Sequence, residues 1–296
     1  MILITDQEFS LFQKLIHQQA GIYLLPAKKP LLEARLGKRI FHLGLDSFTA
    51  YFNYLLENWD EEIAEMLDRV STNETHFFRE PRQFDFLSRL VVHDWTAQAD
   101  AGLRPRHMRV WSAGCSTGEE PYSLAMILWN NFPPSAGWEI EVLATDISNR
   151  ALERARQAIW PIEKAKNIPD AYLKRFMLKG TGAQSGKMKA GAEIRSVIRF
   201  ERLNLNDTVY PVTSLFDIIL CRNVLIYFDD AHRARVADRL LEHLATGGFF
   251  FVGHAEQLNG LMHKILNISP TIYVRVGRGE FGIMGGVPRQ EASGVR

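Results

Sequence analysis

The chain has 296 residues, of which 46% are hydrophobic and 23% are charged, the composition of an ordinary globular protein with a large core. At roughly 150 residues per domain, this length favours two domains. Lys and Arg (35) nearly balance Asp and Glu (34), and the net charge of +1 excludes bulk attraction to nucleic acid or an anionic membrane, though not a local charged patch. Two cysteines, Cys115 and Cys221, exclude a disulfide scaffold and a four-cysteine zinc site.

Neither the N-terminus nor any later segment looks like a membrane signal. The first residues, MILITDQEF, lack the basic segment and the apolar stretch of a signal peptide. The apolar run GGFFFVG (247–253) is far shorter than the ~20 residues that a membrane helix needs. We therefore expect a cytoplasmic protein without membrane insertion.

Residues 1–70 are predicted to form a small all-helical domain of four short amphipathic helices. Thr5 and Glu8 have the spacing of a capping box, and Gly21 marks the end of the first helix. The Pro-containing segment PAKKP opens a second helix, and Ser47 is placed to cap a third. Each helix shows apolar residues at a spacing of three or four.

The second of these helices has a basic side. Between residues 22 and 43 the sequence has five basic residues and one acid. Four of the basic residues fall within roughly a 100° arc of the helix: Lys28, Arg35, Lys38 and Arg39. The arc is either a solvated helix face or a docking surface for an acidic partner helix or nucleic acid.

From residue 109 onward, strands alternate with helices, which predicts a mostly parallel sheet with helices on both faces. The predicted strands are 109–113, 139–146, 197–203, 216–221, 247–253 and 271–276, and the predicted helices are 119–129, 148–158 and 230–245. Two stretches interrupt this rhythm: 93–107 is polar and resembles a linker, and 178–193 is rich in glycine.

The turn GCSTG (114–118) is the strongest local signal for a ligand site. It follows a buried strand and precedes a helix that Ser116 or Thr117 would cap, and such a turn in an α/β sheet is where ligands bind. It is not a G-x-G-x-x-G motif, and the acids Glu119 and Glu120 directly after it would repel a pyrophosphate. They suit a ligand with positive charge, such as the ammonium and sulfonium groups of S-adenosylmethionine.

Other polar segments end neighbouring strands and are expected at the same edge of the sheet. Asp146 ends the second strand, where it would either accept hydrogen bonds from ribose hydroxyls or cap the following helix. The segments STNETHFFRE (71–80), LNLND (203–207) and CRNVLIYF (221–228) are placed similarly. The histidines His76, His232, His243 and His254 lack metal-ligand spacing, so no metal site is expected.

Six segments, in this order and spacing, resemble the chemotaxis receptor methyltransferases, the CheR-type protein-glutamate O-methyltransferases. They are STNETHFFRE, SAGCSTGEEPYSLAM, ATDIS, LNLND, CRNVLIYFD and GHAEQL, and the similarity spans roughly residues 5–276. The resemblance implies a helical N-terminal domain (1–70), a linker segment and helix (71–92) and a Rossmann-like methyltransferase domain (93–276). It also implies an inserted β-subdomain (178–197), and residues 277–296 are expected to be a flexible tail.

The resemblance implies S-adenosylmethionine as the cofactor, with S-adenosylhomocysteine as the product, and it assigns roles to individual residues. It places Asn73, Thr75 and Arg79 at the linker side of the cofactor, Glu120 at the methionine end, Asp146 at the ribose, Asn204 and Leu205 around the adenine, Arg222 and Asn223 at the opposite wall, and Tyr227 at the methyl-transfer position. Gly114 stands where the family often has Ala, and Ala255 where Ser is common.

A glutamate acceptor is already ionised at neutral pH, so methyl transfer to it needs no general base. We expect Arg79 to orient the acceptor carboxylate or to complete the cofactor site, and Tyr227 to donate a hydrogen bond near the reacting atoms. The alternative for Arg79 is a salt bridge with Glu74 or Glu80.

The partners implied are the cytoplasmic helices of chemoreceptors, whose acidic methylation sites the basic arc would face. The glycines Gly180, Gly182 and Gly186 match a small β-subdomain that grips a receptor's C-terminal peptide in part of the family. Two rival functions are a methyltransferase acting on nucleic acid or a small molecule, and a sensor that binds S-adenosylmethionine without turnover.

Overall fold

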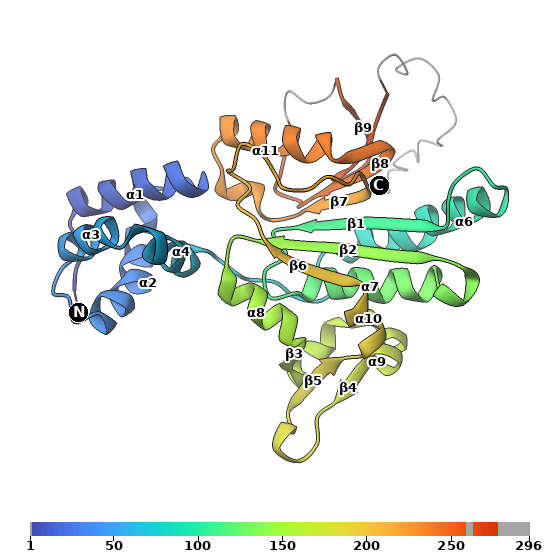
Figure 1. Ribbon diagram of the computed structural model, residues 1–296, viewed down its shortest axis with the longest axis horizontal. Helices are drawn as coiled ribbons and strands as arrows, with labels where there is room; N and C mark the ends of the chain where they lie inside the picture. The colour runs from blue at the N-terminus through green and yellow to red at the C-terminus, as the bar shows by residue number, and fades with distance from the viewer. Residues whose placement is uncertain (1, 259–262, 278–296) are drawn as a thin grey trace, which may run out of the picture.

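The computed structural model describes residues 2–258 and 263–277 and contains two domains (Figure 1). A helical domain lies beside one end of a seven-stranded sheet, and a small three-stranded sheet projects from the α7 side. Within the described residues, no helix has the length and apolar character needed to cross a membrane. The expected tail from residue 278 onward lies outside the described residues.

The helical domain consists of α1 (Asp6–Ala20), η1 (Pro26–Lys28), α2 (Lys29–His42), α3 (Phe48–Glu57) and α4 (Trp59–Val70). The predicted capping box is confirmed, because Thr5 accepts from the Glu8 N–H and Glu8 accepts from the Thr5 N–H. Ser47 caps α3, as predicted. The domain core forms around Phe12, whose ring stacks on Tyr51 at 5.9 Å between centroids.

The connecting segment, residues 71–106 between α4 and the main sheet, is more helical than the sequence suggested. The helix α5 (Pro81–Phe86) continues through a π-helical turn, η2 (Leu87–Val91), into α6 (Val92–Asp100). The linker-like interpretation of 93–107 is therefore wrong up to Asp100. Trp95 and Ala99, one helical turn apart, are buried, and Arg104 covers the Trp95 ring at 3.9 Å. These two buried residues anchor α6, whose other residues are mostly polar.

The main sheet has the strand order β6-β2-β1-β7-β8-β10-β9. The strands are β1 (His107–Ala113), β2 (Glu139–Asp146), β6 (Ile198–Arg202), β7 (Phe216–Cys221), β8 (Leu244–Val252), β9 (Ile265–Ser269) and β10 (Ile272–Arg275). The five neighbouring strands β6, β2, β1, β7 and β8 are parallel, and β10 is antiparallel to both of its neighbours, β8 and β9. This confirms the predicted mostly parallel sheet, although β9 was not predicted.

Helices cover both faces of this sheet, and the central strands β1, β2 and β7 are accordingly buried along most of their length (Figure 1). On β1, Val110 packs into the core shared with α7 (Glu119–Asn131), whereas Trp111 packs into the core shared with α11 (Asp230–Glu242). The helix α8 (Asn149–Gln157) packs on β2 and β6.

The glycine-rich stretch belongs to the three-stranded antiparallel sheet, whose order is β3-β5-β4. Its elements are β3 (Ile159–Pro161), η4 (Ile162–Asn167), α9 (Asp170–Phe176), β4 (Met177–Lys179), η5 (Gly182–Gln184) and β5 (Lys187–Ala190), followed by α10 (Ala192–Ser196). Gly180 is required in the β4–β5 hairpin, because a Cβ there would lie 2.0 Å from the Gln184 carbonyl oxygen.

Candidate functional site

A cavity of about 420 Å³ lies between the helical domain, the connecting segment and the carboxyl ends of β1, β2 and β7. The structure brings to it every residue that the sequence placed at the cofactor or the methyl-transfer position. These are Asn73, Thr75, Arg79, Glu120, Asp146, Asn204, Leu205, Arg222, Asn223 and Tyr227. The volume lies within the range of small-molecule sites.

The turn after β1 forms one wall of this cavity. The helix α7 starts at Gly118, which has a left-handed backbone (φ 96°) and no side-chain cap, so the prediction of Ser116 or Thr117 as the cap is wrong. Ser116 instead donates its hydroxyl to the Asn73 carbonyl oxygen at 3.0 Å and so ties the turn to the connecting segment. Gly114 is needed here, because a Cβ would lie 2.3 Å from Val224 Cγ2.

Asp146 fastens the end of β2 to that turn. Its Oδ2 accepts from the Ser116 N–H at 2.8 Å, and its Oδ1 accepts from the Ser148 N–H at 2.9 Å. The alternative of Asp146 as a helix cap is wrong, because Ser148 caps α8. Burial raises the pKa of Asp146, against these hydrogen bonds, which favour the ionised form. Each carboxylate oxygen has a further lone pair that could accept from a ligand hydroxyl.

Glu120 and Arg222 form a buried ion pair, with Oε2 and Nη1 2.9 Å apart. The other Glu120 oxygen accepts from the Ser112 hydroxyl at 2.7 Å. Burial raises the pKa of Glu120, and Arg222 opposes this effect. Arg222 Nη2 also lies 3.3 Å from Glu80 Oε2 and donates to the Arg79 carbonyl oxygen. One buried cation therefore serves two carboxylates, which leaves a local negative charge.

Arg79 and Tyr227 both line the cavity. Arg79 donates to the backbone oxygen of Glu74 at 3.1 Å, and the Glu80 carboxylate pairs with Arg222 instead, so the structure does not show the alternative salt bridge. Tyr227 belongs to the short helix η6 (Leu225–Tyr227), and its carbonyl oxygen accepts from the Tyr23 N–H at 2.7 Å. The helical domain thus directly holds the backbone of this predicted catalytic residue.

Strained backbone gathers around the cavity. Among the described residues other than glycine, positive φ occurs at Phe78, Glu80, Ser116 and Asn223, which all belong to segments that bound it, and also at Ala158 and Thr271. Such strain persists where surrounding contacts impose it, commonly at functional sites.

Glu256 is a residue at this site to which the sequence analysis gave no role. The carboxylate is buried and accepts from the N–H groups of Asn223 at 3.0 Å and Ile226 at 3.2 Å, and also from that of Gly253. It therefore shapes the loop that carries Asn223 and Tyr227. The only sequence signal was its place in the segment GHAEQL.

The four residues of the predicted basic arc have different surroundings in the structure. Lys28 and Lys38 are exposed, and Lys28 lines the cavity. Arg35 points inward, lines the cavity and donates to Thr72 Oγ1 at 3.0 Å. Arg39 pairs at 2.6 Å with buried Glu62 inside the helical domain. Gly180, Gly182 and Gly186 lie in the small sheet and do not line the cavity.

The donor set fits the predicted cofactor. The Glu120 carboxylate suits an ammonium or sulfonium group, and the Asp146 carboxylate suits ribose hydroxyls. The amide of Asn204 is held in place, because it donates to the Gln19 carbonyl oxygen at 2.7 Å, and its own oxygen accepts from the Asn206 N–H at 3.0 Å. The bond to Gln19 also docks α1 against the loop after β6.

Comparison with known proteins identifies the family. Residues 7–71 match the family model described as the all-alpha domain of CheR methyltransferase, and residues 73–274 match the model of its SAM binding domain. The chain is 36% identical over 261 residues to the chemotaxis protein methyltransferase of Borreliella burgdorferi, which covers 88% of this chain and 91% of that protein. It is 35% identical over 274 residues to the chemotaxis protein methyltransferase of Escherichia coli, covering 92% of each.

A third relative, chemotaxis protein methyltransferase 2 of Pseudomonas aeruginosa, is 34% identical over 275 residues, covering 91% of this chain and 93% of that protein. These matches confirm the fold class, the cofactor and the resemblance stated from the six segments. The chain belongs to the CheR family of S-adenosylmethionine-dependent methyltransferases.

Proposed function

We propose that this protein is a chemotaxis methyltransferase that esterifies glutamate side chains on the cytoplasmic helices of chemoreceptors, and that it acts in the cytoplasm. The observation that carries the proposal is the placement of Arg79, Arg35 and Lys28 on one cavity with the acidic cofactor wall. The names of the three relatives support the chemotactic role.

Side chains of both charges line the cavity. Glu120 and Asp146 line the wall that suits a cationic cofactor, whereas Arg35 comes from α2, Lys28 from η1 and Arg79 from the connecting segment. A glutamate carboxylate would therefore enter on the basic side and meet the cofactor at the acidic side. Bound S-adenosylmethionine supplies an electrophilic methyl group on a cationic sulfur.

The chain's own residues then align the acceptor. Arg79 is proposed to orient the acceptor carboxylate, with one carboxylate oxygen left free to attack, and Tyr227 to donate a hydrogen bond beside it. Because the reaction joins an anion to a cation, charge disappears in the transition state, and a site that excludes water favours the step. A tight pair with Arg79 would also stabilise the ground state, so Arg79 is assigned to positioning rather than to activation.

The test is methyl transfer from radiolabelled S-adenosylmethionine to a receptor cytoplasmic fragment. We expect label in the fragment that mild base releases as methanol, and loss of that label when the acceptor glutamates are replaced by alanine. Base-stable label, or transfer to RNA or metabolites that the fragment does not reduce, would identify a different methyltransferase. Cofactor binding without transfer to any acceptor would identify a sensor.

We also propose that the small sheet binds a receptor C-terminal peptide, with Gly180, Gly182 and Gly186 shaping its hairpin. Both outer strands offer an edge for strand addition. Leu178 on β4 is 60% exposed and Ile159 on β3 is 38% exposed. Leu178→Asp and Ile159→Asp are matched variants, and the one that weakens peptide binding identifies the edge. Unchanged peptide affinity in both would contradict the proposal.

A further inference from the structure

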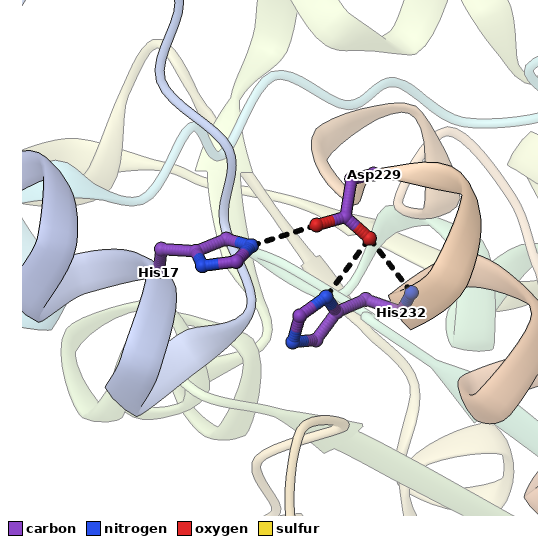
Figure 2. Close-up of side chains that lie close together, drawn as sticks. All are labelled: His17, Asp229 and His232. Atoms are coloured by element: carbon purple, nitrogen blue, oxygen red, sulfur yellow. Dashed lines mark hydrogen bonds and ion pairs between the residues drawn. The ribbon is translucent and has the colours of Figure 1, made fainter.

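Two histidines and one aspartate meet at the boundary between the two domains, outside the residues that line the cavity (Figure 2). His17 comes from α1, Asp229 caps α11, and His232 lies in the first turn of α11. His17 Nε2 lies 2.8 Å from Asp229 Oδ2, and His232 Nδ1 lies 2.9 Å from Asp229 Oδ1. The ring centroids of His17 and His232 are 4.5 Å apart.

We propose that His17, Asp229 and His232 bind one divalent transition-metal ion, of which Zn²⁺ is the first choice. One ligand atom from each residue lies within 4.8 Å of the other two. Zinc bonds of about 2.0–2.2 Å place tetrahedral ligands roughly 3.3 Å apart. The 2.8 Å and 2.9 Å contacts, which reach different oxygens of Asp229, therefore have to open by a few tenths of an ångström so that the ion can lie between the imidazole nitrogens and the carboxylate.

The donor types select the class of metal. Two imidazoles and one carboxylate suit Zn²⁺ and its first-row neighbours, whereas Mg²⁺ and Ca²⁺ prefer oxygen ligands. The His17 and Asp229 side chains are each 33% exposed, so an ion can enter and keep a water molecule as a fourth ligand. Metal binding replaces the two N–H···O contacts, and the imidazole protons move to the outer ring nitrogens.

The surrounding structure holds the ligands in place before any ion binds. Asp229 Oδ1 accepts from the His232 backbone N–H at 2.8 Å, which fixes the carboxylate at the start of α11. A bond of this kind to a ligand's carboxylate is what orients ligands in established metal sites. His17 and Asp229 are 212 positions apart in the sequence, so motif spacing did not reveal the cluster.

A bound ion would link the helical domain to the segment that follows Tyr227, beside the cavity. Asp229 follows Tyr227 by two residues, and the bridge between Ile22 and Phe228 joins the same two segments. The ion would add a third link to this junction, beside the Tyr23–Tyr227 hydrogen bond.

The test titrates the full chain with Zn²⁺ against a chromophoric chelator, with neither receptor nor cofactor present. We expect one saturable site in the wild type. His17→Gln, His232→Gln and Asp229→Asn should each weaken it by more than the roughly 10–100-fold that loss of an outer partner costs. Asn also caps helices, so Asp229→Asn keeps α11 intact. His42→Gln, at an exposed position on α2, is the control and should bind as the wild type does.

A second measurement guards against variants that fold poorly. Zn²⁺ should raise the Tm of the wild type and of His42→Gln, but not of the three ligand variants. Absence of saturable binding in the wild type, or affinity that none of the three ligand substitutions changes, would overturn the proposal. Because the assay contains no acceptor, its outcome is independent of whether receptors are the substrate.

Discussion

Arg222 lies between two carboxylates, 2.9 Å from Glu120 and 3.3 Å from Glu80, and its side chain is almost fully buried. This arrangement joins three segments that are distant in sequence: the loop after β7, the start of α7 and the connecting segment. A guanidinium so placed positions the acidic wall of the cavity and prevents the two carboxylates from repelling each other.

Replacing Arg222 by methionine should therefore be among the most damaging substitutions at the site. It leaves Glu120 and Glu80 without their cation, and breaking a buried pair in this way costs about 3–5 kcal/mol. Thermal and denaturant unfolding should show this loss. The double variant R222M/E120Q removes one stranded charge and should recover part of it. A single variant as stable as the wild type would contradict the assigned role of the pair.

Asp146 should give cofactor binding a characteristic pH dependence. Because burial raises the pKa of Asp146 above the ordinary 3.8, the carboxylate takes up a proton at a higher pH than a free one would. As the pH falls through that raised pKa, affinity for S-adenosylmethionine should fall, since the protonated group loses acceptor capacity. The contribution of Asp146 to the free energy of unfolding should instead rise as the pH falls, because the folded state binds the proton more tightly than the unfolded state.

Calorimetric titration of the cofactor across mildly acidic to neutral pH tests this prediction. Asp146→Asn should bind about tenfold more weakly at neutral pH, the equivalent of roughly 1.4 kcal/mol for a lost hydrogen bond. The difference between wild type and variant should shrink as the pH falls, which isolates Asp146 from Glu120 and Glu256, whose pKa values burial also raises. A difference that stays constant with pH would exclude Asp146 as the titrating group.

Tyr227 should affect the chemical step more than cofactor binding. Tyr227→Phe removes the hydroxyl but keeps the backbone bond with Tyr23, so kcat should fall by about 10–100-fold through misalignment. Affinity for S-adenosylmethionine should be unchanged. Tyr23→Phe is the matched control, since its ring also lines the cavity but is 51% exposed, and it should leave kcat near the wild-type value. Equal effects of the two variants would remove the special role of Tyr227.

The sequence predicted what local chemistry encodes. Thr5 and Glu8 define the start of α1, and polar residues at the ends of strands or directly after them, such as Asp146 and Arg222, meet at one edge because the strands are parallel. It could not show contacts that depend on tertiary placement. Glu256 accepts from N–H groups of a loop 30 to 33 positions away, and the start of α7 after Gly118 has a left-handed backbone rather than a capping side chain.

The side chains of the basic arc also make contacts that the sequence alone could not show. On a helical wheel Arg39 is equivalent to Lys28 and Lys38, but in the structure its guanidinium pairs with Glu62, which also accepts from the Tyr51 hydroxyl at 2.7 Å. Arg39→Ala would strand a buried carboxylate, so it should lower stability by about 3–5 kcal/mol. The KM for a receptor fragment should be unchanged, because Glu62 already engages the Arg39 guanidinium.

Lys28→Glu should change the KM and not the stability, the reverse of Arg39→Ala. Lys28 is exposed and lines the cavity, so reversing its charge should raise the KM for an acidic receptor fragment, more at low salt than at high salt, without changing the Tm. Lys14→Glu, at an exposed position on α1 outside the residues that line the cavity, is the control for net charge and should leave both quantities unchanged. If Arg39→Ala raised the KM and kept its stability, the whole arc would be the docking surface and the division seen here would be wrong.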